Sequence, residues 1–135
     1  MSFDTQSTRR LGSGGPFEER YGYARVVRRG PIVVVSGCTA ISEEGYIIGG
    51  VSVYEQAREA MERIDQALAR VGAELSDVVQ TRMYVTDIER SDEIGRAHRE
   101  VFGDDPPATA MVEVSRLIDP RLLVEVEAMA VVGVA

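Results

Sequence analysis

The chain has 135 residues and a formal net charge of −7, with 44% hydrophobic and 27% charged residues. These values are typical of one soluble globular domain that buries its own core. The negative charge repels phosphate backbones, so we expect no nucleic-acid partner. No run approaches the roughly 18 apolar residues of a membrane helix, and the N-terminus lacks the apolar segment of a signal peptide. We therefore expect a cytoplasmic protein that does not contact a membrane.

The chain has one cysteine and one histidine, too few to indicate metal or thiol chemistry. Cys38 is the only cysteine, so neither an intrachain disulfide nor a cysteine metal cage can form. It lines a pocket or is a small buried apolar residue. His98 is the only histidine, and we expect a partly buried core residue there. The sequence therefore predicts no metal site and no thiol triad.

The N-terminal residues 1–15 are polar and end in the glycine-rich stretch 12–15. This composition predicts a flexible lead-in, followed by a single domain over residues 16–135. The stretch has no preceding strand and no Lys-Ser/Thr pair, so we do not expect a phosphate-binding loop.

Two β-type runs come next, Tyr21 to Val27 and Ile32 to Thr39, and they predict a hairpin. Four consecutive β-branched residues at 32–35 indicate that the second strand is central in its sheet and covered on both faces. Residues 42–50 are expected to form an exposed loop.

A helix is predicted after Ser52. This residue forms a capping box with Glu55, and Gly72 is placed to end the helix. Apolar residues recur at spacings of three and four along one stripe of the helix. They are Tyr54, Ala57, Met61, Ile64, Leu68 and Val71.

A strand over 78–88 and a second helix over 91–102 follow. Ser91 is placed to cap that helix. One face of the strand is predicted to carry Val79, Thr81, Met83 and Val85. The inward stripe of the helix is predicted to be Ile94, Ala97, His98, Val101 and Phe102.

Two further β-type runs close the chain, Thr109 to Leu117 and Leu122 to Val132. Each helix then joins two strands that we expect to be parallel, and right-handed crossovers place both helices on the same side of the sheet. The predicted fold class is α+β, a mixed β-sheet with two helices packed on one face.

The opposite face of this sheet has no helix to cover it. In the last strand this open face is predicted to carry Leu123, Glu125, Glu127, Met129 and Val131. In the strand before, we assign Thr109, Met111 and Glu113 to it and the small aliphatic residues to the helix face. Such a face is too apolar to stay exposed, so we expect oligomerisation through it with cyclic symmetry.

Three carboxylates, at Glu113, Glu125 and Glu127, lie within these apolar strands. Burying a carboxylate is costly unless it is paired, hydrogen-bonded or protonated. Glu125 and Glu127 point the same way, roughly 6.5 to 7 Å apart along the strand. They are either an acid/base group in an interface cleft or structural ion-pair partners. The candidate partners are Arg82, Arg116 and Arg121.

Several motifs, taken together, resemble the YjgF/RidA family from about residue 20 to the C-terminus. They are Val35-Ser36-Gly37, Val71-Gly72-Ala73, Val79 to Asp87, Pro107-Ala108, Val112 to Leu117, and Val124 to Ala128. The resemblance implies a chorismate mutase-like fold and a homotrimer with ligand clefts between subunits. Its best-understood branch hydrolyses enamines and imines, such as 2-aminoacrylate, to keto acids and ammonia. That branch needs no metal or organic cofactor, and we expect none here.

The resemblance also implies roles for single residues. The family's water-activating Glu of the last strand matches Glu125, and its cleft Tyr on the first strand matches Tyr23. The Ser-Gly element of the cleft matches Ser36 and Gly37. Some members were described as ribonucleases, a function that the net charge of −7 disfavours.

The Arg that grips the substrate carboxylate in that branch does not carry over. Its position is Thr109, a Cys two residues further on is replaced by Met111, and an Asn of the second helix matches Gly95. A hydroxyl in place of a guanidinium fork loses roughly a few kcal/mol of charge-assisted binding. The chain therefore resembles the branches that lack this Arg.

We expect a homotrimer that binds a small uncharged or amine-bearing metabolite, with Glu125 as general acid/base in a hydrolytic deamination. The residues expected to contact the ligand are Tyr23, Ser36, Gly37, Thr109 and Met111. The alternative is a non-enzymatic ligand-binding or regulatory module on the same fold. In a third hypothesis, Arg82 or Arg25 of a neighbouring subunit replaces the missing guanidinium. The roles of His98 and Glu127 stay open.

Overall fold

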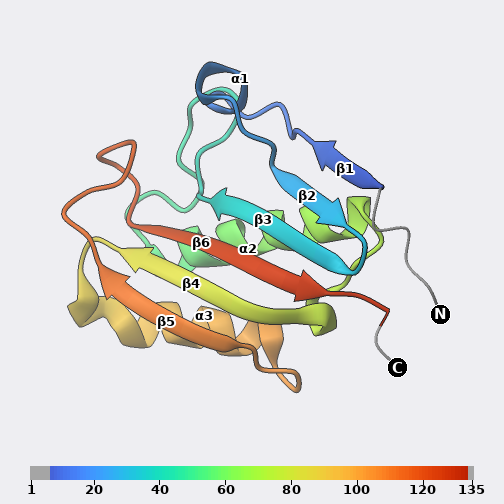
Figure 1. Cartoon of the computed structure of the whole chain (residues 1–135). Coiled ribbons are helices and arrows are strands. Elements are labelled where there is room, and N and C mark those ends of the chain that lie inside the picture. The colour runs from blue at the N-terminus through green and yellow to red at the C-terminus, as the bar shows by residue number, and fades with distance from the viewer. Residues whose placement is uncertain (1–6, 134–135) are drawn as a thin grey trace.

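The computed structural model describes residues 7–133 and contains one six-stranded sheet with helices packed against it (Figure 1). In chain order the elements are β1 (Thr8–Leu11), α1 (Glu18–Tyr21), β2 (Val26–Arg29), β3 (Ile32–Cys38), α2 (Val53–Arg70), η1 (Leu75–Asp77), β4 (Val78–Val85), η2 (Ile88–Arg90), α3 (Ser91–Phe102), β5 (Ala108–Glu113) and β6 (Val124–Val131). The strands lie in the order β1-β2-β3-β6-β4-β5. The predicted α+β class is confirmed. No helix within the described residues is long and apolar enough to cross a membrane.

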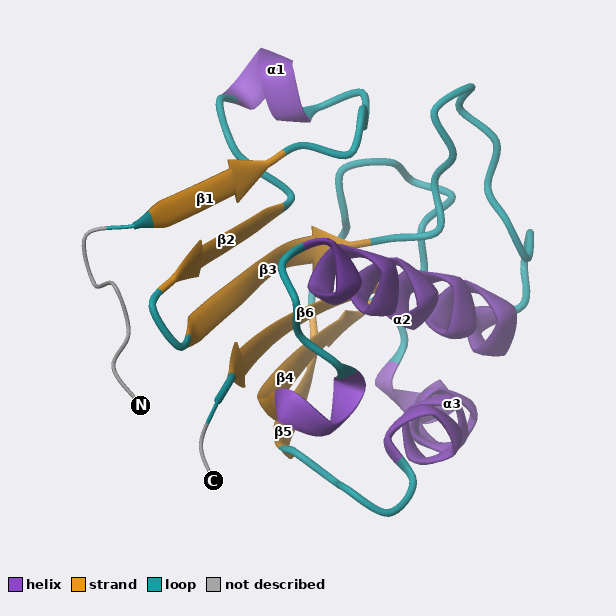
Figure 2. Cartoon of the chain, turned by 90° about the vertical axis from the view of Figure 1, so that its right-hand side faces the viewer, coloured by secondary structure: helices purple, strands orange, loops and turns teal. Residues whose placement is uncertain are grey.

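Helices α2 and α3 lie on one face of the sheet (Figure 2). α2 begins at its N-cap Ser52, whose hydroxyl accepts a hydrogen bond from the amide of Glu55 at 3.2 Å. Gly72, at φ 78°, follows the last turn in the left-handed region. The predicted stripe is buried against β3 and β6, at Ala57, Met61, Ile64, Leu68 and Val71. The start, inward face and end of this helix are therefore as predicted, but only the Ser52 half of the predicted capping box forms, because the Ser52 amide donates to the carbonyl of Gly49 at 3.0 Å.

The second long helix, α3, covers the predicted range, but Ser91 is not its cap. The Asp87 side chain accepts a hydrogen bond from the amide of Glu89 and opens η2, which runs directly into α3. Ser91 is therefore the first helical residue and Arg90 the N-cap. Ile94, Ala97 and Phe102 face the core as expected.

The sheet is mixed, with the predicted strand directions. β4 and β5 are parallel neighbours. β6 is antiparallel to both β3 and β4 and separates them, so β3 and β4 also run the same way. Both helices thus connect parallel strands, which places them on the same side of the sheet.

The prediction that Val79 shares a face with Thr81, Met83 and Val85 is wrong, because Val79 is 43% exposed whereas the other three are buried. The register with β6 shifts between Val78 and Gln80, so that an extra residue enters β4 at this point. Because of this extra residue, the side chains before the bulge point to the opposite faces from those that strict alternation predicts. Val78 is therefore buried in place of Val79, while Thr81 and Met83 stay inward.

The predicted faces of β5 are reversed. Thr109 pairs with Thr81 and Met111 with Met83, which are buried beneath the helices. Directly paired residues share a face, so Thr109 and Met111 lie on the helix side, and Val112 lies on the open side. The alternation of this short edge strand is set by its pairing with β4 and not by which of its residues are small.

β5 also ends earlier than predicted. The predicted strand reached Leu117, but β5 stops at Glu113, whose carboxylate accepts a hydrogen bond from the amide of Ile88 at 3.1 Å. Glu113 is thus a structural acceptor at the strand end.

The N-terminal segment is folded where a flexible lead-in was predicted. Thr8–Leu11 forms β1, paired antiparallel with β2 at one edge of the sheet (Figure 1). The predicted strand was to begin at Tyr21, but Tyr21 is the last residue of α1 and is followed by Gly22 at φ 73°. The first hairpin strand begins only at Val26. Residues 1–6 of the predicted lead-in lie outside the described residues.

β3 is central, between β2 and β6, as predicted. Its two faces differ, however, because Val33 and Val35 are buried while Ile32 and Val34 are 41% and 47% exposed. One face of the strand is covered by α2, and the other lies on the open side of the sheet. Coverage of both faces is not achieved within a single chain.

Candidate functional site

A cavity of about 900 Å³ opens around the C-terminal end of β3. It brings together four residues expected from the sequence, Tyr23, Ser36, Gly37 and Glu125. Tyr21 and Arg25 also line it. Met111 and Thr109 lie on the helix side of the edge strand β5, which β4 and β6 separate from β3, and they are not among its lining residues.

Glu125 is the carboxylate at the centre of this arrangement. Its side chain is packed over Gly37, so that a Cβ atom at position 37 would lie 2.8 Å from the carboxyl carbon of Glu125. Among the described residues, none donates a hydrogen bond to the Glu125 carboxylate. A glycine at position 37 is therefore required by the space that Glu125 fills.

The surroundings of Glu125 favour its protonated form. Burial raises the pKa of this carboxyl, the negative charge of Glu127 raises it further, and the cation of Arg25 partly opposes both. A carboxyl whose pKa is shifted toward neutrality exchanges protons readily near working pH, as a general acid/base must.

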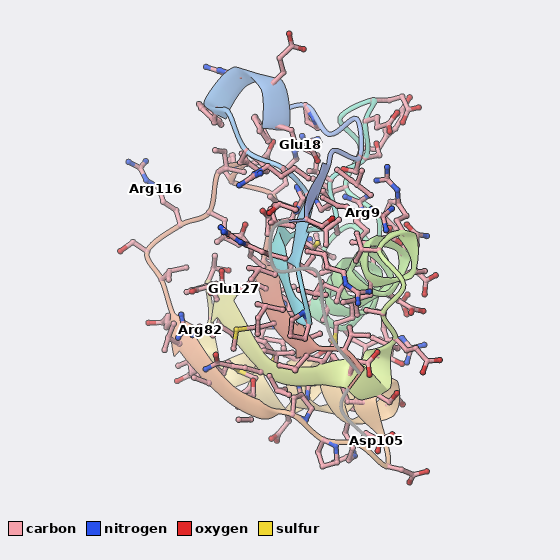
Figure 3. The ribbon with its side chains drawn as sticks, turned by 45° about the vertical axis from the view of Figure 1, so that its right-hand side comes forward. Arg9, Glu18, Arg82, Asp105, Arg116 and Glu127 are labelled. Atoms are coloured by element: carbon pink, nitrogen blue, oxygen red, sulfur yellow. The ribbon has the colours of Figure 1, made fainter. Side chains whose placement is uncertain are left out.

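Glu127, two residues further along β6, is engaged in structural contacts. The Tyr84 hydroxyl donates to it at 2.6 Å, and the Arg82 guanidinium lies 3.8 Å away (Figure 3). Arg116 points away from the sheet in the same view, and Arg121 pairs with an aspartate of its own loop. Of the three candidate arginines, Arg82 is the one that contacts Glu127. Glu125 and Glu127 are thus not equivalent.

Arg25 is more deeply engaged than the sequence indicated. Its side chain is 12% exposed, its Nε–H donates to Glu18 at 3.3 Å, and its Nη1 donates to the backbone carbonyls of Ser36 and Gly37 at 3.1 and 2.6 Å. Its Nη2 reaches the Tyr23 hydroxyl at 3.5 Å. Most of its donors are therefore used within its own chain.

Glu18 is the site-supporting residue that the sequence did not reveal. It is 7% exposed, and its carboxylate accepts hydrogen bonds from the amide and hydroxyl of Ser13 at 2.8 and 2.5 Å. Gly12 and Gly15 approach the same carboxylate so closely that a Cβ atom would lie 2.9 and 3.2 Å from its oxygens. The glycine-rich stretch thus wraps around a buried carboxylate, and no local sequence signal marks this.

The balance of effects on Glu18 favours its charged form. Burial raises the pKa of Glu18, but the Ser13 hydrogen bonds and the charge of Arg25 outweigh it and leave the pKa below its ordinary value. The Glu18–Arg25 pair is therefore an ionised pair at neutral pH.

Aromatic rings form the outer wall of the cavity. Phe17 and Tyr21 are stacked with ring centroids 5.8 Å apart, and Tyr21 and Tyr23 are 53% and 37% exposed. Tyr23 lies in the loop after α1, not on the first strand as expected. Ser36 is held by a hydrogen bond from its hydroxyl to the carbonyl of Ala24 at 2.7 Å.

Thr109 belongs to a separate hydrogen-bonded chain on the helix side. His98 Nε2 lies 2.8 Å from the Thr81 hydroxyl, which donates to the Thr109 hydroxyl at 2.7 Å. Thr109 in turn donates to the carbonyl of Thr81 at 3.2 Å. These directions assign His98 as the Nε2–H tautomer, and burial lowers the pKa of its ring. His98 is thus a packed, hydrogen-bonded core residue.

Cys38 lies beside the cavity but is only 2% exposed. Burial raises the pKa of its thiol, although Arg25 Nη1 at 3.5 Å opposes that shift. A buried thiol with a raised pKa is a poor nucleophile. Within residues 7–133, no group of three or more His, Cys, Asp or Glu side chains is placed to hold a metal ion.

The sequence and fold of the chain are similar to those of known proteins. The family model described as Endoribonuclease L-PSP matches residues 17–132. The chain is also similar to Rv2704 of Mycobacterium tuberculosis, a member of the YjgF/YER057c/UK114 family. That crystal structure has 48% identity and a TM-score of 0.85, over 93% of this chain and 100% of the other. The chain belongs to the YjgF/RidA family.

Two sequence relatives of this YjgF/RidA chain differ in how similar they are to it. An uncharacterized protein of Streptomyces coelicolor is 36% identical over 129 residues, 96% of each chain. The human 2-iminobutanoate/2-iminopropanoate deaminase is 26% identical over 113 residues, covering 82% of this chain and 80% of the relative. The relatives of this YjgF/RidA chain therefore include an imine deaminase.

Proposed function

We propose that the chain forms a homotrimer and binds a small amine-bearing or uncharged metabolite in a cleft between subunits. In that cleft Glu125 acts as general acid/base in the hydrolysis of an imine or enamine. The observation that carries the proposal is the state of the Glu125 carboxyl. It lies in a cavity, receives no hydrogen bond from the described residues, and has a raised pKa. Burying an acid in this way costs stability, so a functional reason is favoured.

The ligand class follows from the charges in the cavity. The cation of Arg25 is matched by Glu18 at 3.3 Å, whereas Glu125 has no ion pair among residues 7–133. Within the part of the chain that the structure describes, the ion-pair partner of Glu127 is the half-exposed Arg82, at 3.8 Å. Of the other charged side chains that line the cavity, Arg63 pairs with Glu59 at 2.9 Å, and Arg70 and Glu43 carry opposite charges. With Glu125 ionised the excess charge is thus negative, which favours an iminium or ammonium group over a carboxylate substrate.

The aromatic wall supports the same ligand class. The exposed rings of Tyr21 and Tyr23 stand at the cavity mouth. Aromatic faces bind apolar bodies and also organic cations. Thr109, which stands where the resembling deaminases have the carboxylate-gripping Arg, offers no cation for an imino acid.

The chemistry needs only one proton-transferring group. The Glu125 carboxylate takes a proton from water as the water oxygen bonds to the iminium carbon, which gives a carbinolamine. Glu125 returns this proton to the nitrogen, the C–N bond breaks, and the hydroxyl proton passes to the departing ammonia, which leaves as ammonium. An iminium ion and water thus become a carbonyl compound and ammonium, and the carboxylate is regenerated.

The direct test is ammonia release from a panel of imines by the wild type and Glu125→Gln. The panel holds 2-iminopropanoate and uncharged or amine-bearing imines. We expect a fall of about 100-fold or more for the variant on its best substrate. Glu113→Gln is the matched control and keeps wild-type activity, because Glu113 lies outside the cavity. If wild type and Glu125→Gln are equally active or equally inert, Glu125 is not the catalyst.

A non-enzymatic ligand-binding module is the second candidate, and Thr109 favours it. A module of this kind binds its ligand without turnover. Ligands that raise the Tm of the protein without releasing ammonia or any other product would select this candidate.

A further inference from the structure

We infer that Arg25, held in place by Glu18, is a positioning residue for the Glu125 site. It fixes the Ser36–Gly37 backbone against which the Glu125 carboxyl packs, and it sets the charge around that carboxyl. The inference deepens the proposed function and rests on the role proposed there for Glu125.

The first step is an irregularity in β3. Val35 pairs with Ala128 and Cys38 with Val126, so Ser36 and Gly37 together oppose the single residue Glu127. A bulge of this kind disrupts the ladder and leaves backbone groups without their usual partners. The carbonyls of Ser36 and Gly37 need other donors at this position.

Arg25 supplies those donors. One guanidinium nitrogen, Nη1, donates to both carbonyls, at 3.1 Å to Ser36 and 2.6 Å to Gly37. The amide of Ser36 donates to the backbone carbonyl of Arg25 at 2.9 Å, so the two segments are linked in both directions. Arg25 is therefore the side chain that bonds both carbonyls of the bulge, beside the Ser36 hydroxyl bond to Ala24 at 2.7 Å and the Cys38 thiol on the Ser36 carbonyl at 3.4 Å. Glu125 lies on the glycine of that bulge.

Arg25 is itself held rigidly. Its Nε–H donates to Glu18, and these two side chains are 12% and 8% exposed. Glu18 in turn is anchored by two hydrogen bonds from Ser13. A planar guanidinium with donors pointing in several directions can serve Glu18 and two carbonyls at once, which a lysine ammonium does less well.

Arg25 also acts on Glu125 through its charge. The charged or titratable groups near Glu125 are Glu127 on the same strand, Cys38 on β3, Tyr84 on β4 and Arg25. Among the described residues, Arg25 is the cation that favours the ionised form of Glu125, whereas Glu127 disfavours it. Removing Arg25 therefore takes away both the backbone support and the favourable charge.

The test is an NMR titration of the Glu125 side-chain carboxyl in wild type, Arg25→Gln and Arg25→Lys, assigned with Glu125→Gln. We expect the Arg25→Gln midpoint to rise by about one pH unit, as for loss of a nearby opposite charge. Arg28→Gln is the matched control, because Arg28 also donates to two backbone carbonyls, of Gly30 at 3.0 Å and Val71 at 2.6 Å. Its Glu125 midpoint should stay at the wild-type value.

Arg25→Lys separates charge from geometry and covers the case in which Arg25→Gln does not fold. It keeps a cation near Glu125, so the midpoint should move less than in Arg25→Gln. Because the two-carbonyl clamp is lost, amide exchange at the bulge should still rise about tenfold. An unchanged midpoint in Arg25→Gln, or wild-type exchange at the bulge in Arg25→Lys, would overturn the inference. The titration needs no substrate, so its result stands even where the Glu125→Gln activity test fails.

Discussion

The Glu125 side chain of β6 fills the space beside Gly37 of β3 that a larger side chain at position 37 would need. A Cβ atom on Gly37 would lie 2.8 Å from the Glu125 carboxyl carbon and 3.1 Å from its Cγ. The glycine does not have a positive φ, so its backbone is open to any residue. It is the volume of the Glu125 side chain that requires glycine at this position.

Gly37→Ala is therefore expected to push the Glu125 carboxyl from its position. The overpacking should cost about 1–3 kcal/mol of unfolding free energy, and ammonia release should fall along with it. Urea denaturation and the imine assay measure the two effects. Gly95→Ala is the control: Gly95 lies within α3 with nothing within 4 Å of an added Cβ, so the variant should be more stable by about 0.5–1 kcal/mol. A Gly37→Ala protein as stable and active as wild type would contradict the packing argument.

Glu125→Gln should stabilise the protein at neutral pH. The pKa of Glu125 is raised in the folded state, so the folded protein holds this proton more tightly than the unfolded chain does. The resulting stability is complete below the unfolded pKa of about 4.3 and is lost as the pH rises through the folded pKa. The raised folded pKa therefore makes the wild type less stable at neutral pH than a variant with a neutral side chain at this position.

Thermal unfolding at two pH values measures this effect. We expect the Tm of Glu125→Gln to exceed that of wild type by roughly 3 °C at pH 7, with the difference much smaller near pH 4. Glu62→Gln, on the exposed side of α2, serves as the control and should change the Tm little at either pH. A wild type that is the more stable at pH 7 would mean that Glu125 is paired in the folded protein.

The helices of this fold could be predicted from the sequence because a buried stripe repeats over several turns. In α2 the periodic apolar residues from Ala57 to Leu68 all face the core. In β5 the alternation misleads, because Ala108, Ala110 and Val112 form the more apolar side but Thr109 and Met111 share the face of the buried Thr81 and Met83. Only the pairing of Thr109 with Thr81 decides which way that strand faces.

The supporting residues of the site could be predicted less well than Glu125 itself. Glu125 stands out as an acid in an apolar strand, whereas Glu18 lies in a short polar segment with three other charged or polar neighbours. Its burial depends on Ser13 and on Arg25, which is brought near by the fold. Contacts of this kind leave no periodic pattern in the sequence.

The chain of hydrogen bonds from His98 through Thr81 to Thr109 predicts the effect of restoring the family residue as Thr109→Arg. This change removes the acceptor of the Thr81 hydroxyl, which should then donate to His98 Nε2. The His98 ring should switch from the Nε2–H to the Nδ1–H tautomer, visible in ¹⁵N NMR, with a loss of about 1 kcal/mol in stability. Thr109→Ser keeps the hydroxyl and should keep the wild-type tautomer. An unchanged tautomer in Thr109→Arg would show that the chain does not run in this direction.

The same variant tests how the missing guanidinium affects imino acids. If Arg82 of a neighbouring subunit already grips the substrate carboxylate, Thr109→Arg should add little activity on 2-iminopropanoate. A gain of about 100-fold or more would instead show that wild type lacks this contact. Arg82 is the freer of the two candidate arginines, since its side chain is 56% exposed whereas that of Arg25 is 12% exposed.

The open face of the sheet predicts how the proposed trimer is held together. Ile32 and Val34 of β3 are 41% and 47% exposed there, in register with Val131 and Met129 of β6. Val34→Lys places a charge in the middle of this face, and a buried unpaired charge is costly. Light scattering after size exclusion should therefore show monomers for Val34→Lys and trimers for wild type. Val51→Lys, at a loop position that is 89% exposed, is the control and should remain trimeric. A monomeric wild type would overturn the proposed trimer, and a Val34→Lys protein that stays trimeric would place the subunit contact elsewhere.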